Sequence, residues 1–287
     1  GALVLGLAPE GPAEAAERRG ARPGELAAAP TRAAGRGSRG AAAEDGAVAR
    51  RRLLEQLDVV LLAHGADAVE LGIPFTDPLA DGTTIQKANE IALTAGTTFS
   101  GCLSLVTEAR SQGLSIPVLL MGYANPFIAY GEEKAIRDAA DAGADGFIVV
   151  DLPPEESKDF VRICKQQNMS FVPLISPTTT SERIEYISQI ADTFLYCVSV
   201  TGTTGKRETL PSDLKAFIQR IKEKTDLPLA VGFGISTQSH VAQVGKIADA
   251  VVMGSAIISV IDAAGGVNAA QHIREFVSHI TAHDDSQ

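Results

Sequence analysis

Short apolar runs alternate with amphipathic stretches along the chain from residue 50 onward. Each run is rich in Val, Ile, Leu or Phe, which is typical of strands that are buried on both faces of a parallel sheet. The runs are Ala68–Leu71, Val118–Met121, Phe147–Val150, Phe171–Ile175, Phe194–Val198, Leu229–Val231 and Ala250–Met253. The pattern therefore predicts seven buried strands.

The stretches between these runs predict helices, because apolar residues recur at helical spacing between recognisable ends. The predicted helices are Leu53–Leu61, Glu132–Ala142, one that opens at Pro154 and Glu155, Ser181–Ile190, Asp213–Lys224 with Ser212 as its cap, and Gln238–Gly245. One strand and one helix recur about every 30 residues, the size of a βαβ unit. No break in composition marks a switch point, so a (β/α)₈ TIM barrel is favoured over a doubly wound sheet.

Seven strands are one short of a closed barrel. The first strand has to come from Ala2–Leu7, from a degraded piece near Ala41–Val48, or from nowhere. We therefore expect an α/β (β/α)₈ TIM barrel in which strand 1 is atypical or missing. A chain that truly lacks it would expose strand edges beside strands two and eight, and would be aggregation-prone or inactive.

The amino-terminal segment, residues 1–49, differs in composition from the rest of the chain. The first 50 residues contain 16 Ala and 9 Gly, and such a segment buries too little apolar surface to offset the entropy of ordering. We predict disorder over residues 9–47 and a barrel domain over residues 50–287. An organelle transit peptide and a sequence artefact remain open as alternatives, although six acidic residues count against the transit peptide.

Charge and cysteine content exclude several classes of protein. The formal net charge is −10, which argues against a nucleic-acid or anionic-membrane partner. No apolar run reaches the roughly 18 residues that span a bilayer. Cys102, Cys164 and Cys197 have neither metal-ligand spacing nor disulfide density, so a reducing compartment is expected.

Two carboxylates follow the first of the seven runs. Glu70 stands at the predicted strand end, and Asp81 follows eleven residues later in a loop dense in Gly, Pro and Asp. Apolar Ile73, Phe75 and Leu79 would partly desolvate Glu70, which raises its pKa and suits it to acid and base catalysis. The alternative is that the aspartates of this loop only shape turns.

Glycine-rich loops follow the last three runs, at Ser199–Gly205, Gly232–Ser236 and Gly254–Ala256. Glycine lets the backbone approach an anion closely, so three such loops at one barrel mouth indicate a phosphate site. The alternative is that these glycines only turn the chain tightly. No lysine falls at a strand end and the five histidines do not cluster, so we expect a site without metal or cofactor.

The sequence resembles the tryptophan synthase alpha chain over roughly residues 53–262, and most of all the alpha region of fused fungal-type enzymes. The resemblance is carried by six motifs: Glu70-Leu-Gly-Ile-Pro-Phe-Thr-Asp-Pro-Leu-Ala-Asp81-Gly, Met121-Gly-Tyr123-Ala-Asn-Pro, Val150-Asp-Leu-Pro-Pro, Gly202-Thr-Thr-Gly205, Gly232-Phe-Gly-Ile-Ser236 and Gly254-Ser-Ala. It implies a lyase that cleaves indole-3-glycerol phosphate to indole and glyceraldehyde 3-phosphate by a retro-aldol reaction.

The resemblance also implies roles for individual residues. Glu70 matches the acid and base, and Asp81 matches the carboxylate that binds the indole N–H. The matching substrate-binding residues are Tyr123, Met121, Ile148 and Phe233 for the indole pocket, Tyr196 as the active-site tyrosine, Thr204 on a mobile loop, and Gly205, Gly234, Gly254 and Ser255 for phosphate. For the two tyrosines, the residues alone favour ordinary core packing.

Further expectations concern partners and location. The loop with Pro74 and Asp77 matches the one that touches the beta subunit, which implies a beta subunit or fused beta domain holding pyridoxal phosphate, with no cofactor in this chain. A cytoplasmic location follows from the fungal resemblance, and a plastid from the transit-peptide alternative.

One departure from the family leaves other functions open. The family's first strand and its loop carry an aromatic residue and a Gly-Asp-Pro-like turn, and neither occurs in the first 50 residues. A catalytically impaired barrel that binds or activates a beta partner is therefore the main alternative. A sugar-phosphate isomerase or epimerase is a weaker one, because the loop from Glu70 to Asp81 argues against it.

Overall fold

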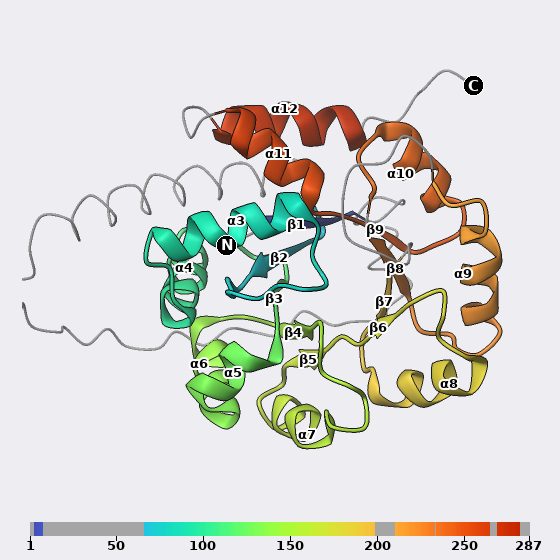
Figure 1. Ribbon diagram of the computed structural model, residues 1–287, viewed down its shortest axis with the longest axis horizontal. Coiled ribbons are helices and arrows are strands. Elements are labelled where there is room, and N and C mark those ends of the chain that lie inside the picture. The colour runs from blue at the N-terminus through green and yellow to red at the C-terminus, as the bar shows by residue number, and fades with distance from the viewer. Residues whose placement is uncertain (1–2, 8–65, 199–209, 233, 265–268, 282–287) are drawn as a thin grey trace, which may run out of the picture.

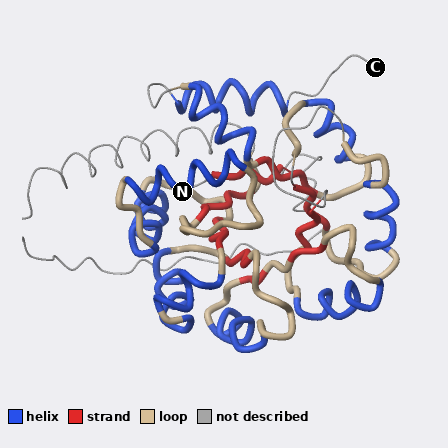
Figure 2. Tube along the Cα trace, in the orientation of Figure 1, coloured by secondary structure: helices blue, strands red, loops and turns tan. Residues whose placement is uncertain are grey.

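The computed structural model describes residues 3–7, 66–198, 210–232, 234–264 and 269–281. In this part of the chain, strands form a central ring and helices surround it (Figures 1 and 2). The predicted (β/α)₈ barrel is confirmed. The predicted disorder over residues 9–47, the helix at Leu53–Leu61 and the domain boundary at residue 50 lie outside the described residues.

The sheet contains nine strands in the order β5-β4-β3-β2-β1-β9-β8-β7-β6. They are β1 (Leu3–Leu7), β2 (Ala68–Gly72), β3 (Val118–Gly122), β4 (Gly146–Val149), β5 (Ser170–Phe171), β6 (Leu174–Ile175), β7 (Leu195–Val198), β8 (Leu229–Gly232) and β9 (Ala250–Met253). All seven predicted strands are present, and their ends differ from the prediction by at most one residue.

One predicted strand, Phe171–Ile175, is divided into β5 and β6. The β5 segment pairs with β4, and β6 pairs with β7. The residues between them continue both pairings, since the Val172 N–H donates to the Phe147 carbonyl (2.9 Å) and the Tyr196 N–H donates to the Pro173 carbonyl (3.1 Å). Proline has no N–H to donate, which interrupts the ladder without opening the sheet. The two segments therefore close the ring.

Strand β1 fills the gap between β2 and β9, so the first strand is not missing. It runs antiparallel to both neighbours, with Val4 opposite Glu70 and Gly6 opposite Val252, whereas the other pairs of strands are parallel. The prediction of an atypical strand is confirmed, and its atypical feature is direction. As a consequence, Leu3 lies beside Leu71, at the end of the barrel where the parallel strands finish.

Ten helices cover the outside of the ring in the described ranges. They are α3 (Thr83–Thr94), α4 (Phe99–Ser111), α5 (Ala124–Tyr130), α6 (Glu132–Ala142), α7 (Lys158–Gln166), α8 (Ser181–Ile190), α9 (Leu214–Lys222), α10 (Gln238–Gly245), α11 (Ser255–Ala263) and α12 (Ala269–Thr281). The predicted bounds of α6, α8 and α10 are confirmed. Gly143 ends α6 in the left-handed conformation, with φ of 91°, which glycine adopts without strain.

Two predicted helix starts were wrong. Helix α7 begins at Lys158 because Pro154 and Glu155 form a turn, in which the Glu156 N–H donates to the Pro153 carbonyl (3.0 Å). Helix α9 begins at Leu214, with Asp213 rather than Ser212 at the cap position. In both cases the residues before the helix are used in turns, which composition does not distinguish from a first helical turn.

Two apolar clusters separate the outside of the barrel from its inside. The larger cluster packs the outward-facing strand residues against the helices and includes Phe127, Phe147, Phe160 and Phe171. The smaller one fills the barrel interior. Its buried members are Leu119, Ile148, Val172, Tyr196, Ala230 and Val252. The interior is therefore packed with side chains from five strands and from the segment between β5 and β6, as in other TIM barrels.

A half-buried guanidinium ties helix α4 to the start of two strands. Arg110 donates from Nη1 to the carbonyls of Leu114 (2.6 Å) and Ile116 (2.8 Å), and from Nε to the Gly143 carbonyl (2.9 Å). Its Nη2 donates to Asp145 Oδ2 at 2.6 Å, and the same oxygen accepts the N–H of Val118, where β3 begins. This cluster fixes the amino-terminal end of the barrel, opposite the strand ends where chemistry is expected.

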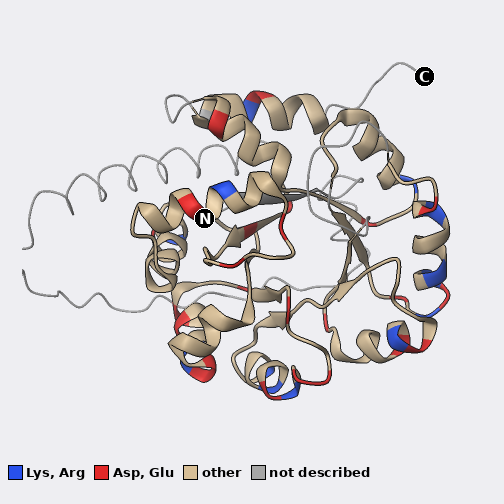
Figure 3. Cartoon of the chain, viewed as in Figure 1, with Lys and Arg blue, Asp and Glu red and all other residues tan. Residues whose placement is uncertain are grey.

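The charged residues lie mostly on the outside, and the cysteines are buried, as in an ordinary folded domain. Figure 3 shows Lys and Arg on the outer helices, whereas acidic residues also occur on β2 and the loop after it. Cys102, Cys164 and Cys197 are buried free thiols. Within the described ranges no helix is long and apolar enough to cross a membrane, and no three His, Cys, Asp or Glu side chains are grouped as metal ligands.

Candidate active site

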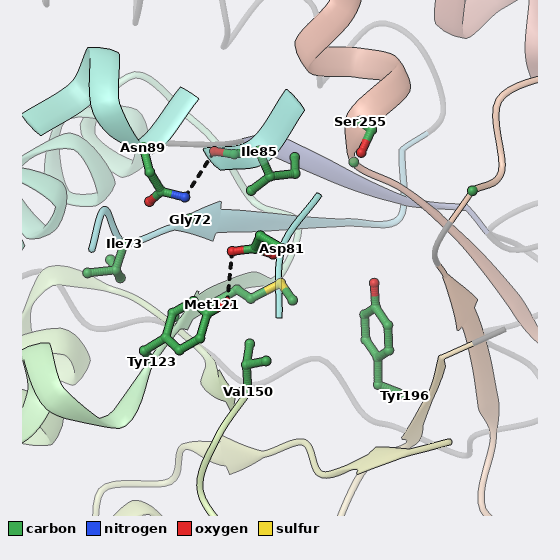
Figure 4. Close-up of a pocket in the computed structure, with 13 residues that line it drawn as sticks. Gly72, Ile73, Asp81, Ile85, Asn89, Met121, Tyr123, Val150, Tyr196 and Ser255 are labelled. Carbon is green, nitrogen blue, oxygen red and sulfur yellow. Dashed lines mark hydrogen bonds between the residues drawn. The ribbon is translucent and has the colours of Figure 1, made fainter. Parts of the chain in front are cut away.

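An open cavity lies at the carboxyl ends of the strands (Figure 4). The lining residues are Gly72, Ile73, Asp81, Ile85, Asn89, Met121, Gly122, Tyr123, Val150, Tyr196, Gly234, Gly254 and Ser255. The wall is thus assembled from β2, β3 and β7 and from the segments that follow β2, β3, β4, β8 and β9.

Glu70 faces the interior of the barrel, two residues before Gly72 in the cavity wall. The sequence suggested that Glu70 stands at the end of its strand. Strand β2 continues to Gly72, however, so Glu70 occupies the middle. Its parallel partner Leu119 belongs to the interior cluster, so the Glu70 side chain faces inward as well. Glu70 is 2% exposed, and its Oε2 has no hydrogen-bond partner among the described residues.

Burial changes the acidity of Glu70. Removal of its carboxylate from water raises the pKa from 4.5 to about 8, so the group is neutral at pH 7. The predicted direction of the shift agrees with this value. The predicted source was partly wrong, because Leu79 is 86% exposed and shields nothing, whereas the barrel interior surrounds the carboxyl.

Asp81 reaches the cavity from the loop between β2 and α3. The Tyr123 hydroxyl donates to Asp81 Oδ2 at 3.1 Å and accepts the Ala80 N–H at 3.0 Å (Figure 4 draws the first of these bonds). Burial raises the pKa of the Asp81 carboxyl, and the hydrogen bond from Tyr123 opposes that rise. Burial and the neighbouring Asp81 charge raise the pKa of Tyr123, so its phenol keeps its proton.

Tyr196 is close enough to Glu70 and Asp81 for the charges of both carboxylates to affect its pKa. It stands on β7, is buried, and points its hydroxyl into the cavity from the side opposite Tyr123 (Figure 4). Burial raises its pKa well above 10, and the charges of Glu70 and Asp81 act in the same direction. The phenol therefore remains protonated and can donate a hydrogen bond to a ligand.

The far side of the cavity is formed by backbone that suits an anion. Gly234 has φ of 87°, a conformation that glycine tolerates, and it lines the cavity after β8. Gly254 and Ser255 line it at the start of α11, and no side chain of the described residues caps this helix end. Unpaired N–H groups at the first turn of a helix attract phosphate.

The remaining predicted site residues differ in where they lie relative to the cavity. Met121 lines the cavity, whereas Ile148 is fully buried in the interior cluster and is not part of the wall. Thr204, Gly205 and Phe233 lie outside the described residues. Seven of the predicted site residues thus line the cavity, and Glu70 faces the barrel interior nearby.

Other lining residues were not found by sequence reasoning. These are Gly72, Ile73, Ile85, Asn89, Gly122 and Val150. Ile85 and Asn89 stand four residues apart on α3, and this spacing places them on one helix face. The signal was weak because Ala92 is the only fully buried residue of α3 in the described structure, so its apolar pattern is faint.

Comparison with known proteins identifies the family. A sequence model described as "Tryptophan synthase alpha chain" matches residues 46–285. An alpha chain from Roseiflexus sp. is 47% identical over 209 residues, which is 73% of this chain and 80% of that protein. The chain belongs to the tryptophan synthase alpha chain family.

Two further relatives extend this result. The tryptophan synthase of Saccharomyces cerevisiae is 51% identical over 196 residues, and this match covers 68% of the present chain but only 28% of the yeast protein. A chain of the tryptophan synthase α2β2 complex from Pyrococcus furiosus superposes with a TM-score of 0.75 at 36% identity, covering 80% of this chain and 92% of that one.

Membership of the tryptophan synthase alpha chain family confirms the expected activity. The chain is an indole-3-glycerol-phosphate lyase of tryptophan biosynthesis. The alpha reaction needs no cofactor, and pyridoxal phosphate belongs to the beta subunit of these enzymes.

Proposed function

We propose that this tryptophan synthase alpha chain cleaves its substrate in the cavity at the barrel mouth, with Glu70 as acid and base and Asp81 as the ligand of the indole N–H. The observation that carries this proposal is the buried carboxyl of Glu70, whose Oε2 has no hydrogen-bond partner among the described residues and which stands two residues before Gly72 in the wall of a cavity that holds a second carboxylate. An unpaired buried oxygen costs free energy, which is typical of functional groups.

The two carboxylates suit a retro-aldol cleavage. Protonated Glu70 donates its proton to the indole ring carbon that carries the side chain, and positive charge develops on the ring nitrogen. Ionised Asp81 accepts a hydrogen bond from that N–H and stabilises the charge. The resulting Glu70 carboxylate then takes the proton of the adjacent hydroxyl while the carbon–carbon bond breaks, which yields indole and an aldehyde and regenerates the neutral acid.

The substrate phosphate is proposed to bind at the side of the cavity that is formed by the segments after β8 and β9. Backbone N–H groups near Gly234 and at the start of α11, with the Ser255 hydroxyl, would hold it. Tyr196, Tyr123 and Met121 would surround the indole ring, and Thr204, Gly205 and Phe233 keep their expected roles as proposals. Ile148 would support this pocket from below rather than touch the ring.

A beta subunit or fused beta domain is proposed as the acceptor of indole. Two similar solved structures are of the tryptophan synthase complex from Pyrococcus furiosus, and the yeast relative is much longer than this chain. In this chain the exposed loop with Thr76, Asp77 and Leu79 is available for such contact. Co-migration with a beta subunit in size-exclusion chromatography tests this, and separate elution at micromolar concentrations would contradict it.

Two broader assignments complete the proposal. Residues 50–287 constitute the lyase domain, which the family match over residues 46–285 supports. The enzyme is proposed to act in the cytoplasm, as the resemblance to fungal-type enzymes implies. A fluorescent fusion of the whole chain that accumulates in an organelle would contradict this location.

One observation favours the alternative of an impaired barrel. Strand β1 runs antiparallel, so its first residue, Leu3, lies at the mouth, whereas a parallel first strand would end there and lead into a loop. A barrel without such a loop in the cavity wall would bind substrate more weakly. A chain that stimulates a beta partner without releasing indole would be the corresponding result.

The decisive assay is indole release from indole-3-glycerol phosphate by the whole chain, its Glu70→Gln variant and its Asp81→Asn variant. We expect both substitutions to lower kcat by about a hundredfold or more, because each removes a group that acts in the transition state. Glu133→Gln, on the exposed face of α6, is the matched control and should retain full activity. Equal rates in the parent and Glu70→Gln chains would overturn the proposal.

A further inference from the structure

The loop that carries Asp81 is exposed at its tip but fixed at its ends. Thr76, Asp77 and Leu79 face solvent, whereas Asp81 faces the cavity. At the start of the loop, the Ile73 N–H donates to the Met121 carbonyl at 2.7 Å. The position of the Asp81 carboxylate therefore depends on the contacts that hold the rest of the loop.

Asn89 supplies one of these contacts from helix α3. Its Oδ1 accepts the N–H of Phe75 at 3.1 Å, and its Nδ2 donates to the Ile85 carbonyl at 3.0 Å. Figure 4 shows Asn89 at the cavity wall with the bond to Ile85. Both polar atoms of the amide thus bond to backbone, which fixes the orientation of the side chain and its distance from the loop.

The contact at Phe75 is connected with Asp81 through Tyr123. The Phe75 and Tyr123 rings pack with centroids 5.3 Å apart, and the Tyr123 hydroxyl binds both the Ala80 N–H and the Asp81 carboxylate. Gln86, also on α3, donates from Nε2 to the Asp81 carbonyl at 2.9 Å. Side chains from α3 and from Tyr123, the residue after β3, therefore hold the loop at its middle and at its end.

We propose that Asn89 is a positioning residue for the lyase reaction: by holding the Phe75 N–H it sets the reach of the loop and hence the place of the Asp81 carboxylate in the cavity. This inference rests on the proposed role of Asp81. Asn89 acts through the loop and takes no proton. A displacement of a catalytic group by about 1 Å lowers rates by as much as a hundredfold, so a single anchoring bond is sufficient to matter.

Two substitutions separate the hydrogen bond from the shape of the side chain. Asn89→Leu keeps the approximate volume and removes both polar atoms, whereas Asn89→Asp keeps an oxygen that accepts the Phe75 N–H. Lys87→Ala is the control on the same helix, because it removes only an exposed ion pair with Asp262. Asp81→Asn measures the contribution of the carboxylate itself.

The measurements are kcat and KM for indole release and hydrogen exchange at the Phe75 amide. We expect Asn89→Leu to lower kcat about tenfold or more with little change in KM, and to speed exchange at Phe75 but not at Val231 in β8. Asn89→Asp should recover most of both losses, and Lys87→Ala should change neither. A merely structural role would instead speed exchange in both places.

Three outcomes would overturn the inference. Unchanged kcat in Asn89→Leu would do so, as would equal losses of kcat in Asn89→Leu and Asn89→Asp while Phe75 stays protected in the latter. Full activity in Asp81→Asn would remove the role of Asp81 and the inference with it. That last result is distinct, because the exchange at Phe75 would still report whether Asn89 holds the loop.

Discussion

Glu70 combines two properties that rarely occur together in a folded protein. It is an ionisable side chain inside a packed barrel, and one of its oxygens has no hydrogen-bond partner in the described structure. A group with this environment is costly for stability and useful for proton transfer. The burial that raises its pKa to about 8 therefore links the stability of the chain with its chemistry.

Stability should depend on pH through this residue. Below about pH 4.5 Glu70 is protonated in both the folded and the unfolded chain. As the pH rises toward 8, the unfolded chain loses this proton first, so the free energy of unfolding falls. Glu70→Gln has no such proton and should be more stable than the parent by about 2 to 4 kcal/mol at pH 8.

Urea unfolding at several pH values measures this difference. The advantage of Glu70→Gln should be small near pH 4.5 and grow steadily to pH 8. A constant difference across this range would mean that the carboxyl has an ordinary pKa in the folded chain.

The sequence indicated some site residues and not others, for physical reasons. Glu70 and Asp81 belong to one strand and the loop after it, so their residue types and spacing expose them. Asn89 functions through backbone bonds from a helix whose apolar face is weak. Nothing in a single sequence distinguishes its amide from a solvated one.

At the scale of elements, strand β1 is the least expected feature. An apolar run such as Leu3–Leu7 is the same for a parallel and an antiparallel strand, because side chains alternate in both. Its direction depends on which neighbours it pairs with, and these neighbours are far along the chain. Repeated units such as α6, α8 and α10 were predictable because their ends carry local signals.

Removal of β1 should open the barrel. A chain without residues 1–7 exposes the edges of β2 and β9, and exposed edges of apolar strands promote aggregation. We expect such a chain to elute as large species in size-exclusion chromatography and to lose its cooperative thermal transition. A monomeric product with an unchanged melting temperature would show that β1 is dispensable.

The hydrogen bonds of Arg110 should contribute substantially to the free energy of unfolding, because they join several groups at the amino-terminal end of the barrel. Arg110→Met leaves three backbone carbonyls and Asp145 without this donor, and loss of such a network costs about 2 to 4 kcal/mol. Urea unfolding measures the loss.

Arg137→Met is the matched control for this experiment. Arg137 forms an exposed ion pair with Glu133 on α6, and exposed pairs contribute less than about 1 kcal/mol. Similar losses in the two variants would mean that the Arg110 network contributes no more to stability than an exposed ion pair does.

At the scale of the whole molecule, barrel closure creates the site. Asp81, Tyr123, Tyr196 and Ser255 come from distant parts of the chain, and only the complete ring brings them to one cavity. The carboxyl ends of the strands gather these residues, which is why the barrel prediction also located the chemistry. The packing that leaves Glu70 neutral is likewise a property of the closed interior.

The pH dependence of kcat/KM for indole release by the whole chain tests the central claim most directly, because this ratio reports ionisations of the free enzyme. The neutral Glu70 carboxyl that donates the proton is present below pH 8 and lost above it. We predict release at neutral pH that declines with a midpoint of about pH 8, and background rates in Glu70→Gln throughout. Release that stays constant to about pH 9.5, or no release at any pH, would contradict the account.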